Sequence, residues 1–129
     1  MALALVTAVA PHDVATTVTL LTSALRRRDI TLFATIDHAE GARRAGLELD
    51  DEVVMIFGNP LAGTALMQAD PRAGLDLPLR ILVWAQAGET RLAFHDPHAL
   101  ADDYALAGRE DTLGKLRAVL DGLVAEVTA

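Results

Sequence analysis

The stretch Leu79–His95, LRILVWAQAGETRLAFH, decides the fold. It contains two runs rich in apolar residues, Leu79–Trp84 and Arg91–His95, and Gly88 lies between them. Two such runs joined around a glycine predict an antiparallel β-hairpin. The rest of the chain then has to supply strands that extend the hairpin into a sheet and helices that cover it.

Three further segments are predicted strands. Leu3–Val9 is apolar, Val53–Phe57 is a continuous apolar run that ends at Gly58, and Ile30–Asp37 alternates. A continuous run is typical of a central strand, whereas alternation is typical of a strand with one buried face. We expect one face of the alternating segment to carry Ile30, Leu32, Ala34 and Ile36.

Capping residues mark four helix starts. Asp13, Asp37, Asn59 and Asp96 each precede a segment of helical character, and a proline follows the last two. Such short polar side chains accept hydrogen bonds from the free amides of the first turn, and proline suits the first helical position. We expect the helix after Asp37 to end at Arg44.

Apolar spacing defines two longer helices. One stripe consists of Val14, Val18, Leu21 and Leu25, and the C-terminal stripe consists of Leu113, Leu116, Leu120, Leu123 and Val127. Residues at spacings of three and four share one face of a helix. We expect the C-terminal stripe to dock on the chain's own sheet, with a subunit interface as the alternative.

The order of predicted elements indicates an α+β fold. It is a β-α-β-β-β-β-α core with short extra helices, in which helices pack on a mainly antiparallel sheet. No internal repeat or linker divides the chain, so we expect residues 1–129 to form a single domain.

Composition narrows the class of protein. Of the residues, 52% are hydrophobic and none is cysteine, which excludes a disordered chain, disulfides and cysteine nucleophiles. The net charge of −7 opposes binding to phosphate backbones. The basic run Arg26–Arg28 lies near a predicted helix end, where the helix dipole stabilises positive charge.

No run reaches the ~18 apolar residues of a membrane span, and Met1–Ala10 lacks the basic residues of a signal peptide. We expect a cytoplasmic protein with neither nucleic acid nor membrane as a partner.

Several short motifs occur in an order that resembles a known family. They are Ile36-Asp37-His38-Ala39, Phe57-Gly58-Asn59-Pro60, Gly63-Thr64, Leu66-Met67-Gln68, Leu75-Asp76-Leu77-Pro78-Leu79, Trp84 and Asp96-Pro97. Over about Pro11–Tyr104 the chain resembles the domain-of-unknown-function family numbered 302. The resemblance implies a compact α+β fold of the TATA-binding-protein-like class and a homodimer, and it implies no activity. Leu61 and Ala65 depart from the family's pattern, which weakens any anion-binding role for the Asn59-Pro60 turn.

Four polar residues in predicted loops and at strand ends are candidate catalytic groups: Asp37, His38, Asp76 and His95. A carboxylate beside an imidazole fixes its tautomer and tunes its pKa for acid–base catalysis. The alternative is structural, because Asp37 fits a helix cap and Asp76 can accept backbone hydrogen bonds in its loop. An acid–base enzyme, such as a hydrolase or isomerase, requires two of these side chains to converge in one concave site.

A second set of residues could bind a ligand: Asn59, Thr64, Met67, Gln68 and Trp84. Ligand pockets are mostly apolar with a few polar anchors, although Met67 and Trp84 fit a core equally well. The turn at Asn59 lacks the lysine and glycine spacing of a phosphate loop, and the histidines give no set of three converging metal ligands. We expect no cofactor and no metal.

The leading hypothesis is therefore a non-enzymatic, homodimeric module that binds a small, partly apolar molecule or has a structural role. An acid–base enzyme is the alternative. Nucleic-acid binding is a second alternative, which rests on fold analogy and which the acidic charge disfavours.

Overall fold

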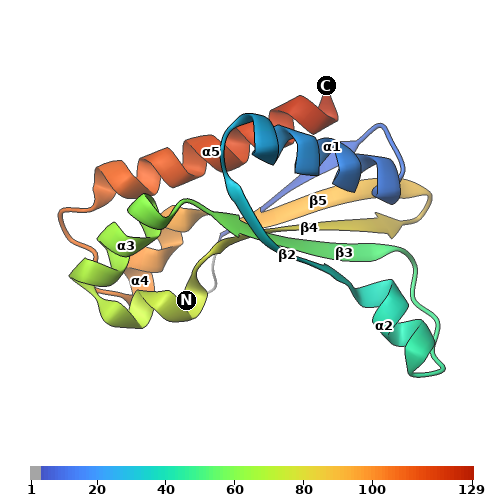
Figure 1. The fold of residues 1–129 in the computed structure, drawn as a ribbon, viewed down its shortest axis with the longest axis horizontal. Coiled ribbons are helices and arrows are strands. Elements are labelled where there is room, and N and C mark those ends of the chain that lie inside the picture. The colour runs from blue at the N-terminus through green and yellow to red at the C-terminus, as the bar shows by residue number, and fades with distance from the viewer. Residues whose placement is uncertain (1–3) are drawn as a thin grey trace.

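The computed structural model describes residues 4–129, so Leu3, the predicted start of the first strand, lies outside the described residues. Five strands form one antiparallel sheet in the order β1-β5-β4-β3-β2, with β1 and β2 at its edges (Figure 1). The strands are β1 (Leu5–Ala10), β2 (Thr31–Asp37), β3 (Glu52–Gly58), β4 (Leu79–Gln86) and β5 (Glu89–His95). The predicted α+β class, the predicted antiparallel sheet and the order of core elements are confirmed.

The helices are arranged asymmetrically around this sheet. They are α1 (Val14–Arg27), α2 (His38–Arg44), α3 (Pro60–Ala69), α4 (Leu100–Asp103) and α5 (Glu110–Thr128), with the 3-10 helices η1 (Pro71–Asp76) and η2 (Pro97–Ala99). The two long helices, α1 and α5, lie side by side on one face of the sheet, while α3 and α4 lie beyond one end and α2 beyond the other (Figure 1). Among the described residues, no helix covers the second face of the sheet.

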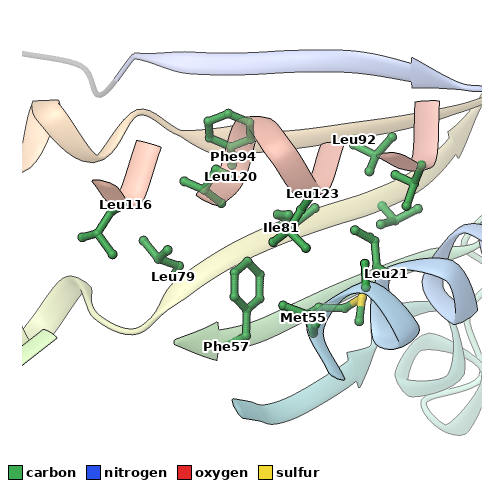
Figure 2. Packing of buried hydrophobic residues seen from close by; sticks show 14 of the residues in the cluster. Leu21, Met55, Phe57, Leu79, Ile81, Leu92, Phe94, Leu116, Leu120 and Leu123 are labelled. Carbon is green, nitrogen blue, oxygen red and sulfur yellow. The ribbon is translucent and has the colours of Figure 1, made fainter. Parts of the chain in front are cut away.

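The core lies between the sheet and the two long helices. Met55, Phe57 and Ile81 point from β3 and β4 towards Leu21 of α1 and Leu123 of α5, and all five are at most 1% exposed (Figure 2). Every residue of the predicted C-terminal stripe is buried. The helix therefore docks on its own sheet, as predicted, because burial of these leucines removes a continuous apolar strip from water.

The predicted caps form the expected hydrogen bonds. Asp13 accepts from the Thr16 amide at 2.8 Å, and Asp37 accepts from the Glu40 amide at 2.9 Å. The Asn59 side chain accepts from the amide of Leu61 at 2.8 Å, and Asp96 caps η2. These contacts satisfy amides that have no partner within their own helix.

The prediction for the faces of β2 was wrong because the strand contains a β-bulge. Leu32 pairs with Phe57 on the core face, but the register shifts at Phe33, and Ala34 pairs with Ile56 on the uncovered face. An extra residue in one strand reverses the side-chain alternation beyond it. Ile36 therefore lies on the opposite face from Leu32.

Two loops also differ from expectation. Asp76, which we expected in a loop, is the last residue of η1, and the Asp70 side chain caps this 3-10 helix. The predicted hairpin is confirmed, but its strands are longer, and a two-residue turn of Ala87 and Gly88 joins them. Both turn residues have positive φ, 52° and 78°, as a type I′ turn requires.

Candidate functional site

The uncovered face of the sheet is apolar where a solvated face is normally polar. Its middle row consists of the cross-strand neighbours Ile36, Val54, Leu82, Ala93 and Thr7. An antiparallel sheet with one face in water usually alternates apolar and polar residues. A row with four apolar members out of five therefore marks this face as a candidate binding surface.

Charged residues flank this apolar row on both sides along the strands. Towards the α3 end of the sheet lie Ala34, Ile56 and Arg80, together with Leu5 and His95. Towards the α2 end lie Glu52, Trp84, Arg91 and Val9. The edge residues Leu5 and Val9 are 62% and 54% exposed. We refer to these as the Arg80 row and the Glu52 row.

The face is hollowed into an open groove of about 640 Å³. Its lining includes Val54, Ile56 and Leu82 from the two central strands. Arg80 and His95 line it in the Arg80 row, and Glu52 lines it in the other. The groove thus combines an apolar floor with charged groups of both signs.

Three of the four predicted catalytic residues line this groove, namely His38, Asp76 and His95. Asp37 does not line it, and its side chain caps α2. Within residues 4–129, no hydrogen bond or ion pair joins any two of the four. Asp76 instead accepts a hydrogen bond from the Tyr104 hydroxyl, and this bond, aided by burial, raises the pKa of Tyr104 to about 12. The groove therefore collects these groups without assembling an acid–base pair from them.

Three of the five predicted ligand-binding residues line a second, smaller cavity. Asn59, Thr64 and Met67 surround about 230 Å³ of space between α3, the bulge of β2 and the start of β4. Gln68 and Trp84 do not line it. Trp84 belongs to the uncovered sheet face, where its indole nitrogen donates to the Gln86 side chain at 3.0 Å.

A buried carboxylate near this cavity has a structural role. Asp70 is 5% exposed, and it accepts hydrogen bonds from the Arg72 guanidinium at 2.9 Å and from the Ala105 amide at 2.9 Å. The bonds from Arg72, followed by that from Ala105, hold the pKa of Asp70 well below its usual range. This residue ties η1 to the segment after α4.

A second tie joins the end of β5 to α5. Asp96 accepts from His98 at 2.8 Å and from Arg117 at 2.7 Å, and the Arg117 guanidinium lies 5.5 Å from the centre of the Phe94 ring. Burial alone would raise the pKa of Asp96, but the bonds from His98 and the charge of Arg117 lower it overall. His98 is engaged in this tie, and no group of three histidine or acidic side chains within residues 4–129 could hold a metal ion.

Several residues of both sites were missed from the sequence. In the sequence, Arg80 and Glu52 look like ordinary polar residues of strands. Only the strand register places them on either side of the apolar row. Phe33 reads as one member of an alternating strand, but the bulge directs it to the small cavity, where it is 55% exposed. The continuous apolar run Val53–Phe57 was the available signal for the groove. Both faces of such a strand are apolar, so both faces of the sheet need a cover.

Sequence comparison identifies the family. Residues 6–123 match the family described as Domain of unknown function DUF302. The chain belongs to the DUF302 family. The crystal structure of an uncharacterised conserved DUF302 protein from Bacillus stearothermophilus has a TM-score of 0.86 to this chain at 15% identity, and the match covers 95% of this chain and 97% of that one. That likeness supports the same α+β fold.

Two curated relatives are longer proteins. The Fluoride-specific ion channel FluC 1 of Brucella suis biovar 1 (strain 1330) and its namesake in Brucella abortus biovar 1 (strain 9-941) are each 36% identical over 126 residues. The match covers 97% of this DUF302 chain and 50% and 47% of those relatives, so the chain spans about half of their length. No helix between residues 4 and 129 is long and apolar enough to cross a membrane.

Proposed function

We propose that this DUF302 protein is a non-enzymatic homodimeric module that also binds a small, partly apolar molecule. The uncovered apolar face of the sheet carries the proposal, and we assign it to a second copy of the chain. A layered domain buries the apolar face of a sheet against another element. Here α1 and α5 cover only one face, so a second sheet is the element that the architecture lacks.

The size of the face suits a stable dimer. Five strands about 4.8 Å apart and six residues long, at about 3.3 Å per residue, outline roughly 480 Å². Two such surfaces, with their projecting side chains, remove roughly 1,000 Å² or more from water, which is the threshold expected of a specific interface. Sheets packed in this way form the aligned sandwich that is common among β proteins.

Charge placement selects one arrangement of the two copies. A two-fold axis along the middle row places the Arg80 row of one copy over the Glu52 row of the other. Arg80 then lies over Trp84 of the second copy and near Glu52 of the second copy, where an ion pair and a cation–π contact are both available. An axis along the strands would instead place two Arg80 side chains together.

The curated relatives fit a role in assembly. In proteins named as fluoride-specific ion channels, a region like this chain accounts for about half of the length. A self-associating module holds together two copies of whatever polypeptide it is joined to. We propose that this is the contribution of the DUF302 half, and that this chain shares the capacity to self-associate.

Sedimentation analysis of the purified chain tests the dimer. We expect a species of twice the 13.7 kDa of one chain at micromolar concentration. Arg80→Glu and Glu52→Arg should each weaken association at least tenfold, and the double variant should restore it. Within one copy the two residues are four strand positions apart, about 13 Å, so rescue requires contact between copies.

A matched pair of substitutions distinguishes loss of the interface from the general effect of placing an aspartate on the protein surface. Leu82→Asp, in the middle row, should give a monomer, whereas Leu47→Asp, at a 65% exposed leucine outside the sheet, should remain dimeric. A wild-type chain that stays monomeric at hundreds of micromolar would refute self-association. Failure of the double charge swap to rescue a dimer that does form would refute the arrangement.

A further inference from the structure

The small cavity beside α3 is bounded by one face of that helix. Pro60, Gly63, Thr64 and Met67 follow the spacing i, i+3, i+4 and i+7, and all four line the cavity. The helix sequence PLAGTALMQA is predominantly apolar, yet Leu66 is its one fully buried side chain. This face of α3 is therefore less completely packed than the face of an apolar helix normally is.

The wall of the cavity opposite α3 contains the Phe33 ring, and the backbone of Gly58 comes close to it. Phe33 projects from the β2 bulge, and Gly58 and Pro78 lie beside it. A Cβ atom built on Gly58 would lie 3.3 Å from the Cβ of Pro78 and 3.8 Å from the Phe33 ring. A Cβ atom on Gly74 would lie 3.1 Å from the Met67 sulfur. The glycines thus let Pro78 and the Met67 sulfur pack closely against the backbone. The lining of the cavity includes both an aromatic ring and a polarisable thioether, which favour contacts with a planar ligand.

Two polar groups at this cavity are free to bind a ligand. Within the described chain, the Thr64 hydroxyl has no hydrogen-bond partner, unlike Thr17, which donates to the carbonyl four residues before it. The Asn59 side-chain oxygen, Oδ1, accepts from the amide of Leu61, which leaves the side-chain NH₂ unpaired among residues 4–129. The lining contains no charged side chain.

The volume sets the size of the ligand. An enclosed apolar cavity of about 150 Å³ accommodates benzene. The cavity here is open to solvent on one side, where Phe33 and Met67 are 55% and 38% exposed, and its volume of about 230 Å³ leaves room for a substituted ring or two fused rings. It is smaller than the ~300 Å³ at which sites for drug-sized ligands begin.

We propose that this cavity binds a small, uncharged aromatic molecule that carries one hydrogen-bonding group and has the size of phenol or indole. The proposal deepens the ligand-binding part of the proposed function and is independent of the dimer. Phe33 and Met67 contact the ring, and the Thr64 hydroxyl and the Asn59 amide bind the polar group. A charged ligand is rejected because no side chain of the lining pairs with it.

Methyl NMR of the full chain tests the proposal with phenol and indole as probes. The Met67 methyl signal should shift saturably with either probe, while the signal of Met55, which is buried in the core, should not. Benzoate should bind at least tenfold more weakly than phenol. The Thr64→Val variant should bind phenol about three- to tenfold more weakly, because it removes one hydrogen bond without changing the shape of the side chain.

Filling the cavity supplies the matched control. Gly63→Leu places a side chain in the cavity, where its Cβ has no neighbour closer than 3.9 Å, and helix propensity also improves. This variant should lose the Met67 response, whereas Gly114→Leu, the same change on α5 where nothing lies within 4 Å, should keep it. No response to millimolar phenol and indole, or equal responses in the Gly63→Leu variant, would refute the site. Sedimentation of the same samples reports the dimer separately.

Discussion

At the scale of single residues, the carboxylates of this chain hold segments together. Asp70 is the clearest case, because one side chain caps η1, pairs with Arg72 and fixes the backbone after α4. Its charge is satisfied by donors from two separate parts of the chain. Such a buried carboxylate stabilises the fold only while it is ionised.

The pH dependence of stability should reveal this role. The folded-state pKa of Asp70 is lowered, so its contribution is fully present above the unfolded pKa of about 3.9 and is lost as the pH falls below it. We expect Asp70→Asn to lower the urea midpoint at pH 7, with a gap to wild type that narrows between pH 4 and pH 2. Asp102→Asn, at an exposed position of α4, should follow wild type at every pH. A gap for Asp70→Asn that is independent of pH would contradict the ionic role.

At the scale of elements, the β4–β5 hairpin contains a correctable strain. Ala87 has a φ of 52°, a left-handed conformation that costs an ordinary L-residue about 1 kcal/mol or more. Asparagine tolerates this conformation and favours type I′ turns when glycine follows. We expect Ala87→Asn to raise the free energy of unfolding by about 0.5 kcal/mol and Gly88→Ala to lower it by about 1 kcal/mol. Urea unfolding of both variants measures the two changes, and equal effects of the same sign would contradict the turn type.

The elements also show what the sequence could predict. Helix starts at Asp13, Asp37 and Asn59 were predictable because a cap depends on the residue and its next few neighbours. The bulge at Phe33 was not, because the alternation of β2 is regular and the shift exists only relative to β3. Local chemistry therefore decided the helices, whereas pairing between strands decided which face each side chain occupies.

The candidate sites divide in the same way. Asn59, Thr64 and Met67 lie close in sequence, and the structure places all three at one cavity, whereas Gln68 and Trp84 of the same predicted set do not line it. Asp76 and His95 line the same groove, but Tyr104, the hydrogen-bond donor to Asp76, lies 28 residues further along the chain. Contacts of this range follow from how α4 and η1 pack, which no short motif records.

At the scale of the whole molecule, the uncovered sheet face links stability to concentration. If the face is buried only in the dimer, unfolding also separates the two copies, and mass action makes the melting temperature depend on protein concentration. A hundredfold increase in concentration favours the folded dimer by about 2.7 kcal/mol.

Differential scanning calorimetry between 1 and 100 µM measures this dependence. We expect the melting temperature of the wild-type chain to rise by several degrees over that range. The Arg80→Glu variant should show a lower melting temperature than wild type at each concentration, because its copies associate at least tenfold more weakly. Arg44→Glu, the same charge reversal on α2 away from the groove, should retain the wild-type dependence. A melting temperature that is constant for wild type would mean that the apolar face stays open to water in the folded protein, and that its leucine, valine and isoleucine side chains contribute nothing to stability through association.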